Sequence, residues 1–88
     1  MPAPSAKNEI NIEVLFFGIT ADFSGVRKVR KTLAAETSVS KVLEQLTAEY
    51  PKLSTVKLLI AIDQEYARGD EMVQDGDELA IFTAVSGG

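Results

Sequence analysis

The sequence predicts an α+β protein in which a mixed β-sheet packs on one main helix. Three features predict it: alternating apolar segments near both ends of the chain, an amphipathic segment over residues 38–50, and a short apolar run at residues 58–62. The chain has 88 residues, 45% of them hydrophobic, which suits one small domain. We expect this domain to span residues 9–83, between an N-terminal extension (1–8) and a C-terminal tail (84–88).

The first predicted strand begins at residue 9 and runs to about residue 17. Its inward phase holds Ile10, Ile12, Val14 and Phe16. Residues 20–25 are expected to form a loop, because they are rich in small and polar side chains. A second strand over roughly residues 26–33 would then complete a β-hairpin.

The amphipathic segment predicts a helix that begins after Ser38, a favourable N-cap residue. Its apolar stripe consists of Val39, Val42, Leu43, Leu46 and Tyr50, which recur at helical spacing. Pro51 ends the helix, since the residue before a proline disfavours helical geometry. Residues 58–62 predict a third strand, residues 64–67 a turn or a short strand, and residues 78–83 the last strand.

This order of a hairpin, a helix and further strands is typical of the β-grasp, or ubiquitin-like, fold. In that fold the first and last strands lie side by side in the middle of the sheet, and the helix covers one face. The ferredoxin-like fold is the alternative. It requires two helices of comparable strength, whereas the sequence indicates one.

The composition excludes several function classes. The chain has no cysteine and no histidine, so we expect no disulfide framework and no thiolate metal site. The carboxylates between residues 63 and 78 do not have the spacing of a calcium loop, so we expect no metal site there either. The net charge of -4 and the pI of about 4.7 argue against a nucleic-acid partner. The polar start lacks a signal-peptide core and no apolar run could span a bilayer, so we expect a cytoplasmic protein without a membrane partner.

The Gly-Gly end is the first candidate for chemistry. Gly87 and Gly88 lack Cβ, so this end is thin enough to thread a narrow active site of another protein. The α-carboxylate of Gly88 is ionised at neutral pH. It can attack the α-phosphate of ATP and become an acyl-adenylate without any side-chain nucleophile. The alternative is a frayed terminus with no chemical role.

The outward phase of the central strands is the second candidate. Leu15 and Phe17 occupy this phase in the first strand, and Ala80 and Phe82 occupy it in the last. If these strands are neighbours, the four side chains form an apolar patch on the helix-free face, which predicts a docking surface. The alternative is that the strand phase differs or that a loop covers the patch.

A short basic cluster lies in the second strand region. It consists of Arg27, Lys28, Arg30 and Lys31. Strand alternation divides these side chains between two faces, so we expect them to be solvated. An acidic groove on a partner is the alternative.

Five segments together carry a resemblance to a known family. They are Val14-Leu15-Phe16-Phe17, Ser24-Gly25-Val26-Arg27, Asp63-Gln64-Glu65-Tyr66, Asp75-Gly76-Asp77-Glu78-Leu79-Ala80 and Val85-Ser86-Gly87-Gly88. In sequence and spacing they resemble the small, sulfur-carrying subunit of molybdopterin synthase, over nearly all of residues 12–88. The family's fold is β-grasp, which agrees with the pattern of elements.

The resemblance implies a mechanism in which this chain holds no cofactor of its own. An activating enzyme uses ATP with Mg to adenylate Gly88, and a sulfur donor then converts the adenylate to a thiocarboxylate. The body docks on the large synthase subunit, in a heterotetramer of two small and two large subunits. The thiocarboxylate then donates sulfur to a cyclic pyranopterin precursor of the molybdenum cofactor.

By matching position, Phe17, Tyr66 and Phe82 are implied to be docking residues. The implied inserted tail consists of Val85, Ser86, Gly87 and Gly88. Many relatives carry two prolines where this chain has Thr83 and Ala84. Because proline restricts φ, the tail here should cost more entropy to order.

Two other functions stay open at this point. One is a sulfur carrier for thiamine thiazole synthesis, although such relatives are usually shorter and lack the long segment between the helix and the last strand. The other is a ubiquitin-like modifier, or a binding module with an inert tail.

Overall fold

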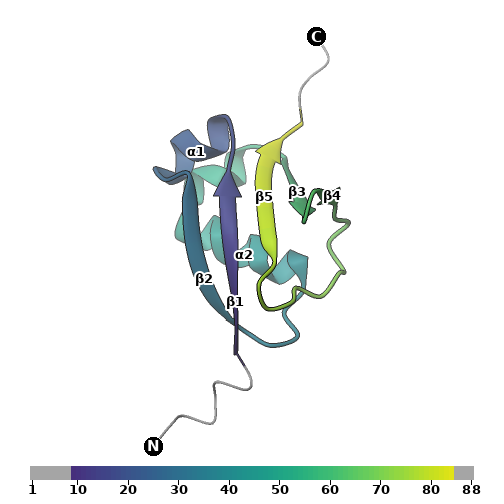
Figure 1. The fold of residues 1–88 in the computed structure, drawn as a ribbon. Helices are drawn as coiled ribbons and strands as arrows, with labels where there is room; N and C mark the ends of the chain where they lie inside the picture. The colour runs from purple at the N-terminus through teal and green to yellow at the C-terminus, as the bar shows by residue number, and fades with distance from the viewer. Residues whose placement is uncertain (1–8, 85–88) are drawn as a thin grey trace, which may run out of the picture.

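The computed structural model describes residues 9–84, which form a five-stranded sheet in the order β2–β1–β5–β3–β4 (Figure 1). The strands are β1 (Glu9–Phe16), β2 (Lys28–Ala34), β3 (Leu58–Ile62), β4 (Glu65–Tyr66) and β5 (Glu78–Thr83). The central pair, β1 and β5, is parallel, and the other neighbouring pairs are antiparallel. With one main helix behind this sheet, the predicted β-grasp fold is confirmed.

The main helix, α2 (Val39–Glu49), covers one face of the sheet (Figure 1). Its first turn is capped by the Ser38 hydroxyl, which accepts a hydrogen bond from the backbone N–H of Lys41 (3.2 Å). The helix ends at Glu49, and Pro51 begins the 3-10 helix η2 (Pro51–Thr55). Both predicted ends of α2 are therefore confirmed.

The core lies between α2 and the inward phases of the strands. Its fully buried side chains include Ile12, Val14, Val39, Val42, Leu46, Leu53, Leu79 and Ile81. Phe16 packs edge-on against Tyr50, with ring centroids 5.7 Å apart. The inward residues predicted for the first and last strands are thus buried, which sends their alternate residues to the opposite face of the sheet.

The loop predicted at residues 20–25 is wrong: this segment forms a short helix, α1 (Ile19–Ser24). Six residues are too few for an apolar period to be visible in the sequence. The helix is fixed by Thr20, whose side chain is fully buried, and it ends at Gly25, whose φ is +82°. As a result β2 begins at Lys28, two residues later than predicted.

The sequence left open whether residues 64–67 form a turn or a short strand, and the structure contains a short strand there. Asp63 and Gln64 have φ values of +48° and +73°, and they join β3 to the short antiparallel strand β4. Positive φ at both central residues is the geometry of a type I′ hairpin turn. The turn places Tyr66 directly beside Ala61 in the sheet.

Candidate functional site

The face of the sheet opposite α2 carries a row of neighbouring residues that crosses all five strands. Lys28 pairs with Leu15, Leu15 with Ala80, Ala80 with Ala61, and Ala61 with Tyr66. Four of these five side chains are apolar or aromatic. The sequence predicted that Leu15 and Ala80 would share this face if their strands were adjacent, and the structure places them side by side.

Aromatic side chains extend this row toward the end of β5. The rings of Tyr66 and Phe82 lie 5.7 Å apart. Tyr66 is 75% exposed and Phe17, which follows directly after β1, is 51% exposed. We call Leu15, Phe17, Tyr66, Ala80 and Phe82 the outer patch. Large apolar side chains grouped on one open face are typical of a surface that binds another protein.

Sequence reasoning missed the contribution of β3 to this face. Leu59 pairs with Phe82, and Ala61 pairs with Ala80. Their neighbour Ile60 pairs with Ile81 and points into the core. The alternation was hidden because every residue of β3 is apolar, so hydrophobicity alone does not reveal which residues face outward.

The position of Phe17 is fixed by hydrogen bonds to β5. Its backbone N–H donates to the carbonyl of Ile81 (3.0 Å), which continues the parallel pairing beyond the last residue of β1. The buried hydroxyl of Thr20 lies 2.6 Å from the Phe17 carbonyl oxygen and 3.0 Å from that of Ile81. Thr20 therefore links the start of α1 and Phe17 to β5. The sequence predicted a loop here and did not indicate this role of Thr20.

The outer patch lies close to the point where the chain leaves the sheet. Phe82 is followed by Thr83, the last residue of β5, and by Ala84. The predicted tail residues Val85, Ser86, Gly87 and Gly88 lie outside the described residues. A partner that covers the patch would thus contact the body of the domain next to the start of that segment.

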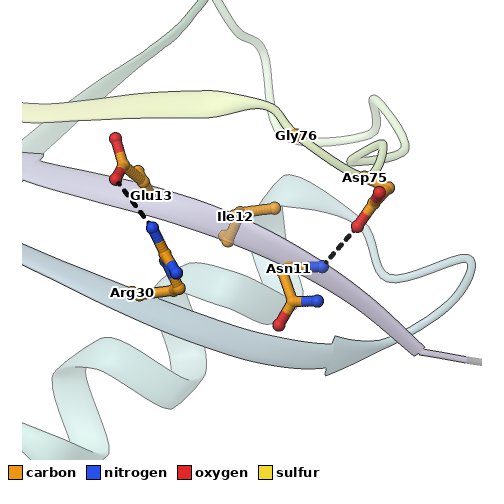
Figure 2. Close-up of a pocket in the computed structure, with 6 residues that line it drawn as sticks. All are labelled: Asn11, Ile12, Glu13, Arg30, Asp75 and Gly76. Atoms are coloured by element: carbon orange, nitrogen blue, oxygen red, sulfur yellow. Dashed lines mark hydrogen bonds and ion pairs between the residues drawn. The ribbon is translucent and has the colours of Figure 1, made fainter. Parts of the chain in front are cut away.

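A hollow on the N-terminal half of β1 is polar (Figure 2). Asp75 accepts a hydrogen bond from the backbone N–H of Asn11 (2.7 Å). Arg30 lies 3.6 Å from Glu13, and the carbonyl of Asn11 accepts from the N–H of Gly76 (2.8 Å). These polar groups are already paired with one another. The hollow is therefore part of the contact between β1 and the turn before β5.

The described residues supply no other obvious centre for chemistry. Among residues 9–84, no group of three His, Cys, Asp or Glu side chains is arranged to hold a metal ion. No helix in the same range is long and apolar enough to cross a membrane.

Comparisons with known proteins agree with the fold and point to a family. The family model described as the ThiS family matches residues 14–88. A molybdopterin synthase sulfur carrier subunit of Arabidopsis thaliana is 30% identical over 83 residues, which cover 92% of this chain and 86% of that protein. The Homo sapiens protein of the same name is 32% identical over 82 residues, covering 88% of this chain and 93% of that protein.

A solved structure is also similar. The crystal structure of Haloferax volcanii small archaeal modifier protein 1 superposes with a TM-score of 0.78 at 28% sequence identity. The superposition covers 86% of this chain and 99% of that one.

Proposed function

Since the chain belongs to the ThiS family, we propose that it is the sulfur carrier subunit of a molybdopterin synthase. Relatives of that name align with most of its length. The observation that carries the proposal is the outer patch, which lies on the open face of the sheet beside the end of β5. One surface can therefore hold the partner while the segment after β5 enters its active site.

In this proposal the reactive group is the α-carboxylate of Gly88. One carboxylate oxygen attacks the α-phosphate of ATP, which an activating enzyme binds with Mg. Pyrophosphate leaves and an acyl-adenylate forms. Hydrosulfide released by a sulfur donor then attacks the acyl carbon, AMP leaves, and a thiocarboxylate replaces the carboxylate. The chain has no histidine and no cysteine, and this sequence of steps requires neither.

The second half of the reaction takes place on the large synthase subunit. The outer patch docks on that subunit, and Val85, Ser86, Gly87 and Gly88 enter its active site. The thiocarboxylate sulfur is transferred to a cyclic pyranopterin precursor. Glycine at the last two positions suits a narrow channel, because no Cβ adds width to the backbone.

Intact-mass spectrometry tests the carrier step. The full chain is incubated with ATP, Mg, the activating enzyme and a sulfur donor. We expect a mass increase equal to the replacement of one oxygen by one sulfur. A variant that lacks Gly88, and a variant with one residue added after it, provide matched controls and should show no such increase.

The result that contradicts the proposal is equally clear. An unchanged mass in the presence of an activating enzyme that sulfurates another carrier would rule out the thiocarboxylate. A fully active extended variant would exclude the Gly88 carboxylate as the reactive group.

A second candidate function is a ubiquitin-like protein modifier. The observation that favours it is the similarity to small archaeal modifier protein 1. Conjugation through Gly88 would leave a branched lysine on a target protein. Because Arg68 is the last lysine or arginine in the chain, trypsin would leave residues 69–88 on that lysine, and mass spectrometry should search for this branch.

A further inference from the structure

A hollow beside Phe17 is continuous with the outer patch. Its lining includes charged side chains, so apolar contacts alone do not account for it. It measures about 530 Å³ and lies where the end of β1, α1 and the start of β2 meet. Its lining includes Leu15, Phe17, Ala21, Asp22, Arg27 and Lys28. Most of the lining surface is apolar. Of its charged side chains, Asp22 lies in α1, Arg27 precedes β2 and Lys28 is the first residue of β2.

Two cations of this hollow have no ionic partner in the part of the chain that the structure describes. Arg27 and Lys28 are both exposed, and neither belongs to the ion pairs there. Those pairs are Arg30 with Glu13 (3.6 Å) and Lys31 with Glu49 (2.5 Å). The basic cluster thus divides into two side chains that are paired within the domain and two that face the hollow.

The position of Arg27 is set by the backbone. The Arg27 carbonyl accepts a hydrogen bond from the N–H of Phe16 (2.8 Å), and Lys28 pairs with Leu15 across the sheet. Both cations are therefore held beside the outer patch. Asp22 supplies the single carboxylate of the lining, so the three formal charges leave a net positive charge.

We propose that this hollow receives an acidic side chain, glutamate or aspartate, of the large synthase subunit, and that Arg27 and Lys28 select it. The inference rests on the proposed function, because it assigns the partner of the same docking surface. Charge complementarity and continuity with the outer patch are the two arguments for it. The methylene groups of the incoming side chain would contact Leu15 and Phe17, while its carboxylate meets the cations.

The expected consequence is association that depends on salt. Complementary charges at the margin of an interface mainly raise the association rate, and salt screens them. Loss of one such cation typically weakens binding by about two- to fivefold at low ionic strength. The apolar contacts of the outer patch should depend much less on salt.

The test measures the affinity and association rate of the full chain for the large subunit at several salt concentrations. Arg27→Glu and Lys28→Glu are compared with Lys41→Glu, which makes the same change in net charge on exposed α2. We expect the first two variants to bind about tenfold more weakly or worse at low salt, with the difference shrinking as salt is raised. Lys41→Glu should match the unmodified chain, and reversing the partner carboxylate to lysine should restore binding of Arg27→Glu.

Each remaining outcome overturns the proposal. If all three charge reversals bind alike while Phe82→Asp still disrupts the complex, the hollow is not a subsite and the proposed function is unaffected. If the full chain self-associates and Arg27→Glu abolishes only that association, the occupant is a second copy. If the unmodified chain forms no complex with the large subunit, both this inference and the proposed docking fail.

Discussion

At the scale of single residues, Thr20 has the most specific structural role. Its side chain is fully buried, and one hydroxyl group lies within hydrogen-bond distance of two carbonyl oxygens, those of Phe17 and Ile81. The hydroxyl therefore links α1 to the end of β1 and to β5. A buried polar group of this kind contributes to stability only while its partners are in place.

Replacing Thr20 with valine tests this link. Valine has nearly the same shape but no hydroxyl, so we expect the free energy of unfolding to fall by about 1–2 kcal/mol. Thr55→Val is the matched control, because the Thr55 hydroxyl donates to the Lys52 carbonyl at an exposed position, and it should change stability by less than about 0.5 kcal/mol. Equal effects in chemical denaturation would show that the buried hydroxyl has no special role.

Glu71 provides a prediction about pH. Its carboxylate accepts hydrogen bonds from the backbone N–H groups of Arg68 (2.7 Å) and Gly69 (2.8 Å). These bonds favour the charged form and lower the pKa of Glu71 below its ordinary value of 4.5. The stability that they contribute is present above the pKa of the unfolded chain and is lost as pH falls through the lower pKa of the folded state.

A carbon-detected NMR titration of the Glu71 carboxyl group should therefore give a midpoint below 4.5. Glu71→Gln should remove this part of the pH dependence of unfolding. A midpoint at or above the ordinary value would contradict the two hydrogen bonds.

At the scale of elements, the segment between β4 and β5 packs against the start of α2. The N–H of Val39 donates to the Glu71 carbonyl, and that of Ser40 donates to the Gly69 carbonyl, both at 2.9 Å. Together with the Ser38 hydroxyl, these carbonyls satisfy N–H groups that a helix start leaves unpaired. The segment between β4 and β5 thus stabilises the start of α2, although the two are far apart in the sequence.

Gly69→Ala should weaken this contact. Gly69 has a φ of +125°, and a Cβ there would lie 2.8 Å from the Ser40 hydroxyl oxygen. We expect a loss of about 1–3 kcal/mol in unfolding free energy, mainly from the strained backbone. The Ser40 hydroxyl also donates to the Gly69 carbonyl (2.9 Å). In the double variant with Ser40→Ala, recovery of stability relative to the sum of the single changes would show that the added Cβ acts through the Ser40 hydroxyl, and strict additivity would leave the strained backbone as the cause.

The elements also show what the sequence could and could not predict. The ends of α2 and the inward phases of β1 and β5 follow from apolar periodicity, from Ser38 and from Pro51, and the structure agrees with each. Helix α1 was missed, because it depends on the long-range hydrogen bond of Thr20 to Ile81 rather than on a local pattern. Leu59 was missed because both faces of β3 carry apolar residues.

The candidate site was predictable to a similar degree. The outward positions of Leu15, Ala80 and Phe82 followed from strand phase, whereas the position of Tyr66 depended on a resemblance. The hollow at Arg27 and Lys28 was not predictable, because it forms only where α1 folds against the β1–β2 hairpin.

At the scale of the whole molecule, the two faces of the sheet differ: one holds the core, and the other is the face that we propose binds the partner. One face packs on α2 (Figure 1) and holds the core. The opposite face carries the outer patch. The parallel pairing of β1 and β5 brings Phe17 and Phe82 to the same end of the sheet. Side chains of adjacent residues in β5 should therefore have different functions, which a pair of substitutions can test.

Phe82→Asp and Ile81→Asp form that pair. Phe82 is half-buried on the outer face and contacts Tyr66. A charge at this position should weaken binding to the large subunit about 30-fold or more, as at an interface hot spot. It should lower the free energy of unfolding by about 1 kcal/mol, because the contact with Tyr66 is lost. Ile81 is fully buried, so the same charge should unfold the domain. Denaturant unfolding and binding are measured on both variants. If Phe82→Asp unfolds as Ile81→Asp does, the outer face contributes to the core and the separation of the two faces is wrong; if it folds and binds normally, Phe82 is not part of the docking surface.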